Sequence, residues 1–268
     1  MNASLARISS WLFALGSLGR LAAGDNPFTA GKWIDLTHEF SAETLYWPTA
    51  ERFTLETEFH GRTPQGYFYA ANRYRASEHG GTHIDAPIHF AEGHQTVDQL
   101  TLAQLTGTAV VVDVSAKAQK NADYQIAVAD LKAWEEGHGR IPADAIVLFH
   151  TGFARHWPEA KKYLGTDEKG PDAVAKLHFP GLHPDAARWL VSERTIKAVG
   201  IDTASIDYGQ STLFESHRTL FEKNIPAFEN VDALDQLPAS GAYVIALPMK
   251  IKGGSGGPLR IVAWVAGR

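Results

Sequence analysis

The sequence predicts a mixed α/β domain, and two recurring patterns carry this prediction. Strand-like apolar runs occur at 32–36, 109–114, 145–149, 198–201, 243–247 and 260–265, and helical patterns occur at 128–136 and 184–193. Buried strands that alternate with amphipathic helices are typical of α/β domains. With 268 residues the chain is long enough to bury a substantial core, and no linker or repeat divides it after Gly31.

The charge and the cysteine count exclude several classes of protein. The formal net charge is −5, so the chain lacks the basic excess of a nucleic-acid-binding protein, and we expect no nucleic-acid partner. The chain contains no cysteine, which excludes disulfides, zinc ribbons, iron–sulfur clusters and thiolate nucleophiles. Any metal must therefore be bound through nitrogen and oxygen.

The first 24 residues form a separate segment with two open interpretations. Arg7 precedes an apolar run at 8–18, and small residues follow at 22–24, as in a secretory signal peptide. Arg20 lies between the run and the small residues, which instead favours an N-terminal helix docked on the protein. The apolar run is too short to cross a membrane, and we expect no membrane partner. The protein is then cytoplasmic, or exported if residues 1–24 are a signal peptide, and the domain itself spans 31–268.

The stretch "EHGGTHIDAPIHF" at 78–90 contains the strongest functional signal. Its two glycines, its β-branched residues and its proline disfavour a helix and favour an extended backbone. In an extended chain His83 and Asp85 share one face, and the glycines allow His79 to fold back toward them. Two imidazoles and one carboxylate form a divalent-cation site with open positions. The alternative is a set of hydrogen-bonded structural histidines.

His89 lies past the proline, four residues after Asp85. From that position it could reach a metal-bound water rather than the metal. A histidine near such a water can act as a general acid and base.

A second cluster lies at 211–231. Leu213, His217, Leu220 and Phe221 have helical spacing, which places His217 on the inward face, where an unpaired imidazole is costly. After Pro226 the run 227–231 is strand-like, and Glu229 alternates with Phe228. Either His217 and Glu229 form a buried structural pair, or both reach the first cluster.

The stretch "GGSGG" at 253–257 formally matches the nucleophile elbow of serine hydrolases. That motif requires a helix after the serine and then an acid and a histidine. Here Pro258 and a strand-like run follow, and no Asp, Glu or His remains after Ser255. We therefore predict a turn near the site that joins two late strands.

The motif "HGGTHIDAPIHF" resembles the signature of the metal-dependent cyclase superfamily, which includes bacterial kynurenine formamidase and isatin hydrolase. Further landmarks are "YWPT" near 46, "GIDTASID" at 200–207, the spacing from His217 to Glu229, and "GGSGGPLR" near the end. The resemblance thus covers most of the chain after residue 31.

This resemblance implies a swivelling β/β/α fold, a homo-oligomer (dimer or tetramer), and metal-dependent hydrolysis of an amide with zinc or manganese. It implies that one metal is held by His79, His83 and Asp85, and that Asp85 bridges to a second metal held by His217 and Glu229. His89 would be the general acid and base, and Trp47 would line the pocket of an aromatic substrate. Glu229 favours the two-metal formamidase pattern, whereas "FPGL" at 179–182 and the longer chain depart from a compact formamidase. The substrate stays open between N-formylkynurenine-like and isatin-like amides.

Other functions remain alternatives. A non-haem iron oxygenase could use His83, Asp85 and His217, but this leaves the other site residues without roles. A non-catalytic, metal-stabilised binding protein would need closed coordination. A serine hydrolase is the weakest alternative. For an aromatic substrate, Tyr46, Trp47, Phe68 and Tyr69 are the candidate flat apolar surfaces.

Overall fold

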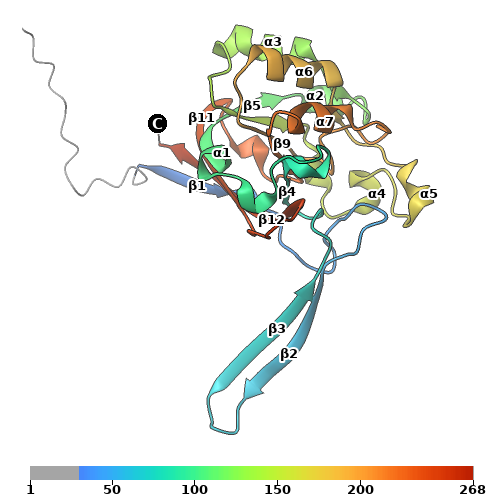
Figure 1. The fold of residues 1–268 in the computed structure, drawn as a ribbon, viewed down its shortest axis with the longest axis vertical. Helices are drawn as coiled ribbons and strands as arrows, with labels where there is room; N and C mark the ends of the chain where they lie inside the picture. Colours follow the sequence, from blue (N-terminus) through green and yellow to red (C-terminus); the bar gives the residue numbers. More distant parts are fainter. Residues whose placement is uncertain (1–29, 268) are drawn as a thin grey trace, which may run out of the picture.

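The protein is described by a computed structural model for residues 30–267, in which seven strands close into a ring flanked by helices (Figure 1). The segment 1–24 lies outside the described residues. Within residues 30–267, no helix combines the length and the apolar character needed to cross a bilayer. The mixed α/β prediction is confirmed.

Ring closure depends on the long last strand, which pairs on both of its edges. Around the ring run β12 (Gly256–Ala266), β11 (Ser240–Pro248), β5 (Thr106–Asp113), β7 (Ile146–His150), β9 (Ala198–Ile201), β10 (Ala227–Glu229) and β4 (His83–Asp85). The start of β12 pairs with β4 and so closes the ring, while its end pairs with β1 (Gly31–Asp35). The β5–β7–β9–β10 strands are parallel, whereas β4, β11 and β12 pair with their neighbours in antiparallel fashion.

The remaining elements are short or peripheral. The other strands are β2 (Thr54–Arg62), β3 (Phe68–Arg75), β6 (Gln125–Ile126) and β8 (Gly181–Leu182). The helices are α1 (Leu102–Leu105), α2 (Ser115–Ala118), α3 (Val128–His138), α4 (Ala160–Tyr163), α5 (Pro171–Val174), α6 (Pro184–Glu193) and α7 (Glu215–Phe221). Within residues 30–267 there are also four 3₁₀ turns: η1 (Pro87–His89), η2 (Val97–Gln99), η3 (Phe153–His156) and η4 (Leu234–Gln236).

Both faces of the parallel strands are buried, which explains their continuous apolar sequences. One core cluster takes residues from every strand of the ring, including Ile84, Phe228 and Val244, and so fills the interior. A second cluster packs the outer side of β5, β7 and β9 against α3, α6 and α7. Figure 1 shows these helices gathered on one side of the ring.

The six predicted strands and the helices at 128–136 and 184–193 are all present, with ends shifted by a few residues at most. The start of the second-cluster helix was predicted too early. Phe214 adopts the left-handed conformation, with φ of 48°, so α7 begins only at Glu215. Leu213 therefore precedes the helix and is 63% exposed.

The hairpin of β2 and β3 was not predicted, and it forms an arm that projects far from the ring (Figure 1). Its strands pair from Thr54↔Arg75 to Arg62↔Phe68. Phe68 and Tyr69 lie near its tip and are 59% and 51% exposed. The expectation that these two rings line the substrate pocket is therefore wrong. Phe68 and Tyr69 follow Trp47 in the sequence, but the arm carries both rings outward.

Candidate metal centre and active site

The centre of the site is the ladder between β4 and β10. Its register places His83 directly opposite Glu229, and Ile84 opposite Phe228. Ile84 and Phe228 enter the interior core, so the alternating residues His83, Asp85 and Glu229 face outward together. The prediction of an extended backbone with His83 and Asp85 on one face is confirmed.

The glycine pair brings His79 to the same point, as predicted. Gly81 has a φ of +59°, which is the left-handed region that side chains rarely adopt, and a Cβ there would lie 2.7 Å from the ring of Phe40. The chain turns at this point, and His79 Nδ1 lies 2.6 Å from Asp85 Oδ1.

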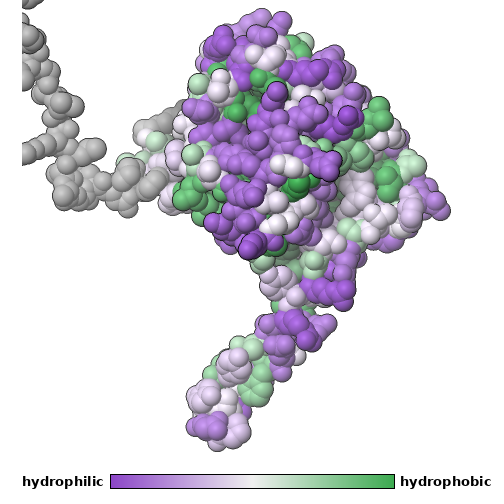
Figure 2. Space-filling model, viewed as in Figure 1, coloured by the Kyte–Doolittle hydropathy of each residue, from purple (hydrophilic) through white to green (hydrophobic). Residues whose placement is uncertain are grey.

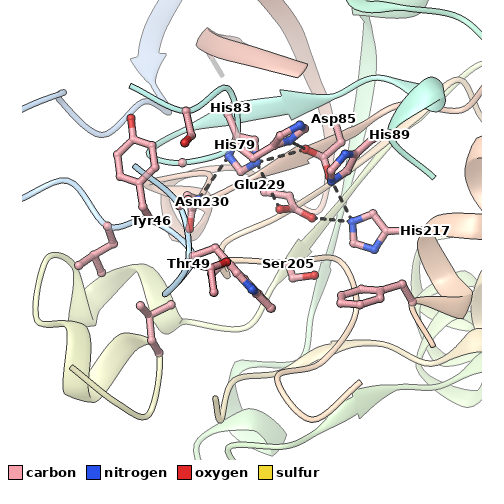
Figure 3. A pocket seen from close by; sticks show the side chains of 18 of the residues that line it. Tyr46, Thr49, His79, His83, Asp85, His89, Ser205, His217, Glu229 and Asn230 are labelled. Atoms are coloured by element: carbon pink, nitrogen blue, oxygen red, sulfur yellow. Dashed lines mark hydrogen bonds and ion pairs between the residues drawn. The ribbon is translucent and has the colours of Figure 1, made fainter. Parts of the chain in front are cut away.

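His217 reaches the cluster from α7. Its Nε2 lies 3.2 Å from Asp85 Oδ2 and 3.0 Å from Glu229 Oε1. Glu229 Oε1 also accepts a hydrogen bond of 2.7 Å from the backbone N–H of Ile206. The helical spacing thus brings His217 to the first cluster, as one of the two interpretations required. Figure 3 shows the imidazoles arranged around the two carboxylates.

Two of these histidines are oriented by hydrogen bonds on their outer nitrogens. His83 Nδ1 lies 2.9 Å from the carbonyl oxygen of Gly81, and His217 Nδ1 lies 2.6 Å from Asp207 Oδ2. Both partners accept hydrogen bonds, so each outer nitrogen donates and each Nε2 faces the centre, where its lone pair is available to a cation once the ring is neutral. Asp207 lies within the "GIDTASID" landmark, but its contact with His217 was not predicted, because no local spacing links the two residues.

The donor set fits a divalent cation. His83 Nε2 is 3.2 Å from Asp85 Oδ1 and 3.5 Å from Glu229 Oε2. Ligand atoms about 2.1 Å from a tetrahedral zinc lie about 3.4 Å apart, which matches both separations. Lone pairs and carboxylate oxygens that face one another at such distances require a positive charge between them.

The direction of the pKa shifts agrees with this requirement. Burial acts to lower the pKa of His83, but Asp85 and Glu229 outweigh it and raise the pKa. Burial also acts to lower the pKa of His217, yet contacts with Asp207, Asp85 and Glu229 hold it well above its usual range. Protons on these rings thus compensate the carboxylates, and a divalent ion would displace them.

The potential ligands fall into two groups that share Asp85. In each group one ligand atom per residue lies within 4.8 Å of the others: His79, Asp85 and His89 form one group, and His83, Asp85 and Glu229 form the other. This grouping differs in detail from the expected one, because His83 lies with Glu229 rather than with His79. His89 lies close enough to be a ligand, so its role as acid and base stays a prediction.

His89 is held against the other imidazoles by η1. Its ring stacks on that of His79 with centroids 3.8 Å apart. Burial is the main cause that lowers the pKa of His89 to about 4. The ring is therefore neutral at neutral pH and able to accept a proton.

A cavity of about 390 Å³ opens above the cluster, and all seven predicted site residues line it. Its walls include Leu45, Trp47, Phe90, Leu164 and Phe214. Trp47 therefore lies where it was expected, and its ring contacts Phe214 with centroids 6.4 Å apart. Tyr46 also lines the cavity, with its ring packed against Gly80, where a Cβ would lie 2.0 Å away.

The "GGSGG" turn lies beside the site, as predicted, and does not form a nucleophile elbow. β12 follows Ser255 directly, where that motif would require a helix. Ser255 instead contacts His79, with 2.8 Å between its Oγ and the ring Nε2.

A closed strand ring that carries four imidazoles and two carboxylates at the floor of an apolar cavity defines a metal-dependent hydrolase. A family model described as "Putative cyclase" matches residues 34–208, and the chain belongs to this cyclase family. The expected cyclase-like fold is thereby confirmed.

Relatives of known name support the assignment. The isatin hydrolase of Roseibium aggregatum is 33% identical over 208 residues, which cover 75% of this chain and 76% of that protein. The kynurenine formamidase of Salinibacter ruber is 29% identical over 229 residues, which cover 85% and 95%. The solved structure of isatin hydrolase A from Ralstonia solanacearum has a TM-score of 0.79 at 35% identity and covers 87% of this chain and 92% of that one.

Proposed function

We propose that the protein hydrolyses the carbon–nitrogen bond of a cyclic aromatic amide of the isatin type, with N-formylkynurenine-like amides as the second candidate class. The observation that carries this proposal is the joining of the histidine–carboxylate cluster to a cavity with aromatic walls. Similarity to proteins named isatin hydrolase is somewhat higher than similarity to those named kynurenine formamidase, at 30–35% against 27–29% identity, which favours the cyclic class.

The residues of the site divide the work of hydrolysis. A bound zinc or manganese ion would supply a Lewis acid that polarises the amide carbonyl and lowers the pKa of water toward ~7. Neutral His89 accepts one proton of the attacking water and returns it to the leaving nitrogen as the carbon–nitrogen bond breaks, giving an amine and a carboxylic acid that releases its remaining proton to solvent. Trp47 and Phe214 bind the flat ring of the substrate and exclude bulk water.

We assign the metal ligands as His79, His83, Asp85, His217 and Glu229. The two oxygens of Asp85 face different histidines, Oδ1 toward His79 and Oδ2 toward His217, which supports two ions per chain that would share Asp85 as a ligand. The buried positions of His217 and Glu229, both beside Asp85, support their assignment to the second ion. We propose zinc or manganese, because nitrogen and oxygen ligands suit both ions.

Removal of metal tests the function as a whole. We expect turnover of isatin, and more weakly of N-formylkynurenine, to vanish on exhaustive chelation and to return with zinc or manganese, while small aliphatic amides react far more slowly. Hydrolysis would be followed by absorbance and metal content by elemental analysis. Full activity of the metal-free protein would refute metal-dependent hydrolysis, and equal rates on aliphatic amides would refute the aromatic class.

Two single substitutions test which histidine binds the metal and which one carries the proton. We expect His83→Ala to lose metal, because His83 Nε2 lies among both carboxylates. We expect His89→Ala to retain metal but to lose turnover by ~10²–10⁴-fold, the usual contribution of a general acid and base. His178→Ala, which alters a surface histidine paired with Asp123, is the matched control. Loss of metal from His89→Ala would make His89 a ligand instead.

The metal count depends on Glu229. We expect about two ions per chain at saturation, and Glu229→Gln should remove one of them, keep the fold and sharply reduce turnover. Titration with excess zinc or manganese measures the plateau. A plateau at one ion in the unaltered protein, or an unchanged count in Glu229→Gln, would leave His217 and Glu229 as a buried structural pair.

We further propose that the protein is a homo-oligomer that uses the β2–β3 arm, and that its other partner is a small-molecule amide rather than nucleic acid or membrane. Two-stranded sheets are only marginally stable alone, and this arm exposes apolar side chains on both faces: Leu55 and Tyr74 on one, Phe59 and Tyr69 on the other. Figure 2 shows an apolar patch midway along the arm.

The oligomer is tested by changing one face of the arm. Phe59 and Tyr69 pack together with centroids 5.6 Å apart, and we expect the double change of Phe59→Ser with Tyr69→Ser to shift the protein to a monomer. Leu102→Ser, at an apolar residue 69% exposed on the ring body, should leave assembly unchanged. Sedimentation velocity gives the mass in each case. A monomeric unaltered protein would contradict the proposal.

A further inference from the structure

The turn between β11 and β12 contacts the outer side of the metal centre through Ser255. Its Oγ lies 2.8 Å from His79 Nε2 and 2.7 Å from Glu78 Oε2. The backbone N–H of Ser255 donates to the same Glu78 oxygen at 3.0 Å. The hydroxyl of Ser255 thus bridges a histidine at the centre and a carboxylate beside it.

Counting protons determines which way these hydrogen bonds run. An ionised carboxylate only accepts, so the single O–H of Ser255 donates to Glu78. The oxygen of Ser255 then accepts from His79, and this requires a proton on Nε2 of the ring. A neutral ring with its proton on Nε2 has a free lone pair on Nδ1. That atom lies 2.6 Å from Asp85 Oδ1, at the metal centre.

Neighbouring groups prevent the imidazole ring of His79 from rotating. A Cβ on Gly256 would lie 2.5 Å from His79 Cε1, so the backbone of the turn packs directly against one side of the imidazole. His89 stacks on the ring with centroids 3.8 Å apart. With the ring held in place, only the position of its proton can vary.

The other tautomer of His79, with its proton on Nδ1, would prevent metal binding by this ring. A proton on Nδ1 would bond to Asp85 across the 2.6 Å gap and would occupy the lone pairs of both residues. His79 is also the exception among the histidines at the centre. His83 and His217 direct Nε2 inward and are anchored through Nδ1, whereas His79 directs Nδ1 inward and is anchored through Nε2.

We propose that Ser255 and Glu78 are positioning residues that hold His79 with its proton on Nε2, so that Nδ1 is available to a divalent cation. This inference rests on the proposed metal-dependent function. It assigns a role to the "GGSGG" turn and to Glu78, which contact the centre through His79 and are not among the residues that line the cavity. Removal of a partner that orients a metal-binding histidine typically weakens metal binding 10–100-fold.

The test measures zinc affinity by competition with a chromophoric chelator, and the tautomer of His79 by ¹⁵N NMR of the zinc-loaded protein. We expect Ser255→Ala to weaken zinc binding 10–100-fold and Ser255→Thr, which keeps the hydroxyl, to restore most of it. Glu78→Ala should also weaken binding, because the hydroxyl of Ser255 loses its acceptor and can turn its proton toward His79. The double change of Ser255→Ala with Glu78→Ala should cost little more than Ser255→Ala alone.

Asp98→Asn is the matched control. Asp98 belongs to a different anchor of the same turn, because it accepts a hydrogen bond of 2.9 Å from the backbone N–H of Gly253. We expect zinc affinity and tautomer to stay unchanged in this variant. Equal losses in Asp98→Asn and Ser255→Ala would reduce Ser255 to a structural anchor, and so would unchanged zinc affinity in Ser255→Ala and Glu78→Ala. Absence of zinc binding in the unaltered protein would instead overturn the proposed function.

Discussion

The structure depends on two carboxylates, Asp85 and Glu229, that are buried side by side. Both are less than 5% exposed, so water cannot solvate their charge. An isolated buried carboxylate is very costly, and two neighbours repel each other as well. Burial and the charge of Asp85 raise the pKa of Glu229, which shows the strain of this arrangement. Several neighbouring groups compensate this negative charge. Imidazoles from β4 and α7 contact the carboxylates, the backbone N–H of Ile206 donates to Glu229, and the arrangement could hold a cation.

The topology explains how these groups meet although they are far apart in the sequence. The ring closes only where β4 pairs with β10 on one edge and with β12 on the other. These short contacts bring three distant parts of the chain to one place, and the site lies at this junction. Asp85 is aligned with Ala227 of β10 on one side and Gly256 of β12 on the other. β4 thus carries two of the assigned ligands, His83 and Asp85, and its pairing with β10 places Glu229 beside them. Closure of the ring therefore also brings these parts of the site together.

Local periodicity could predict the residues that face the site but not the groups that orient them. The alternation of His83, Ile84 and Asp85, and the helical spacing of His217, are properties of single elements and can be read from neighbouring residues. The contacts of Asp207 with His217 and of Ser255 with His79 depend on how turns meet elements elsewhere in the chain. The arm at 54–75 was missed for a different reason. Apolar and polar residues are mixed on both of its faces, so no two-residue alternation marks it as a half-buried strand.

The floor of the cavity is charged and its walls are apolar, and together they restrict the class of substrate that can bind. At the floor, charged carboxylates face histidines, and three of these histidines need a proton fixed on the outer nitrogen so that the inner nitrogen can bind a cation. Three different acceptors hold these outer protons: the backbone carbonyl of Gly81, the carboxylate of Asp207 and the hydroxyl of Ser255. The walls formed by Trp47, Phe90 and Phe214 offer apolar surface and few polar partners. A peptide or a sugar would lose its hydrogen bonds with water at such walls and gain few in return. A flat aromatic amide loses little there and can direct its amide carbonyl to the floor.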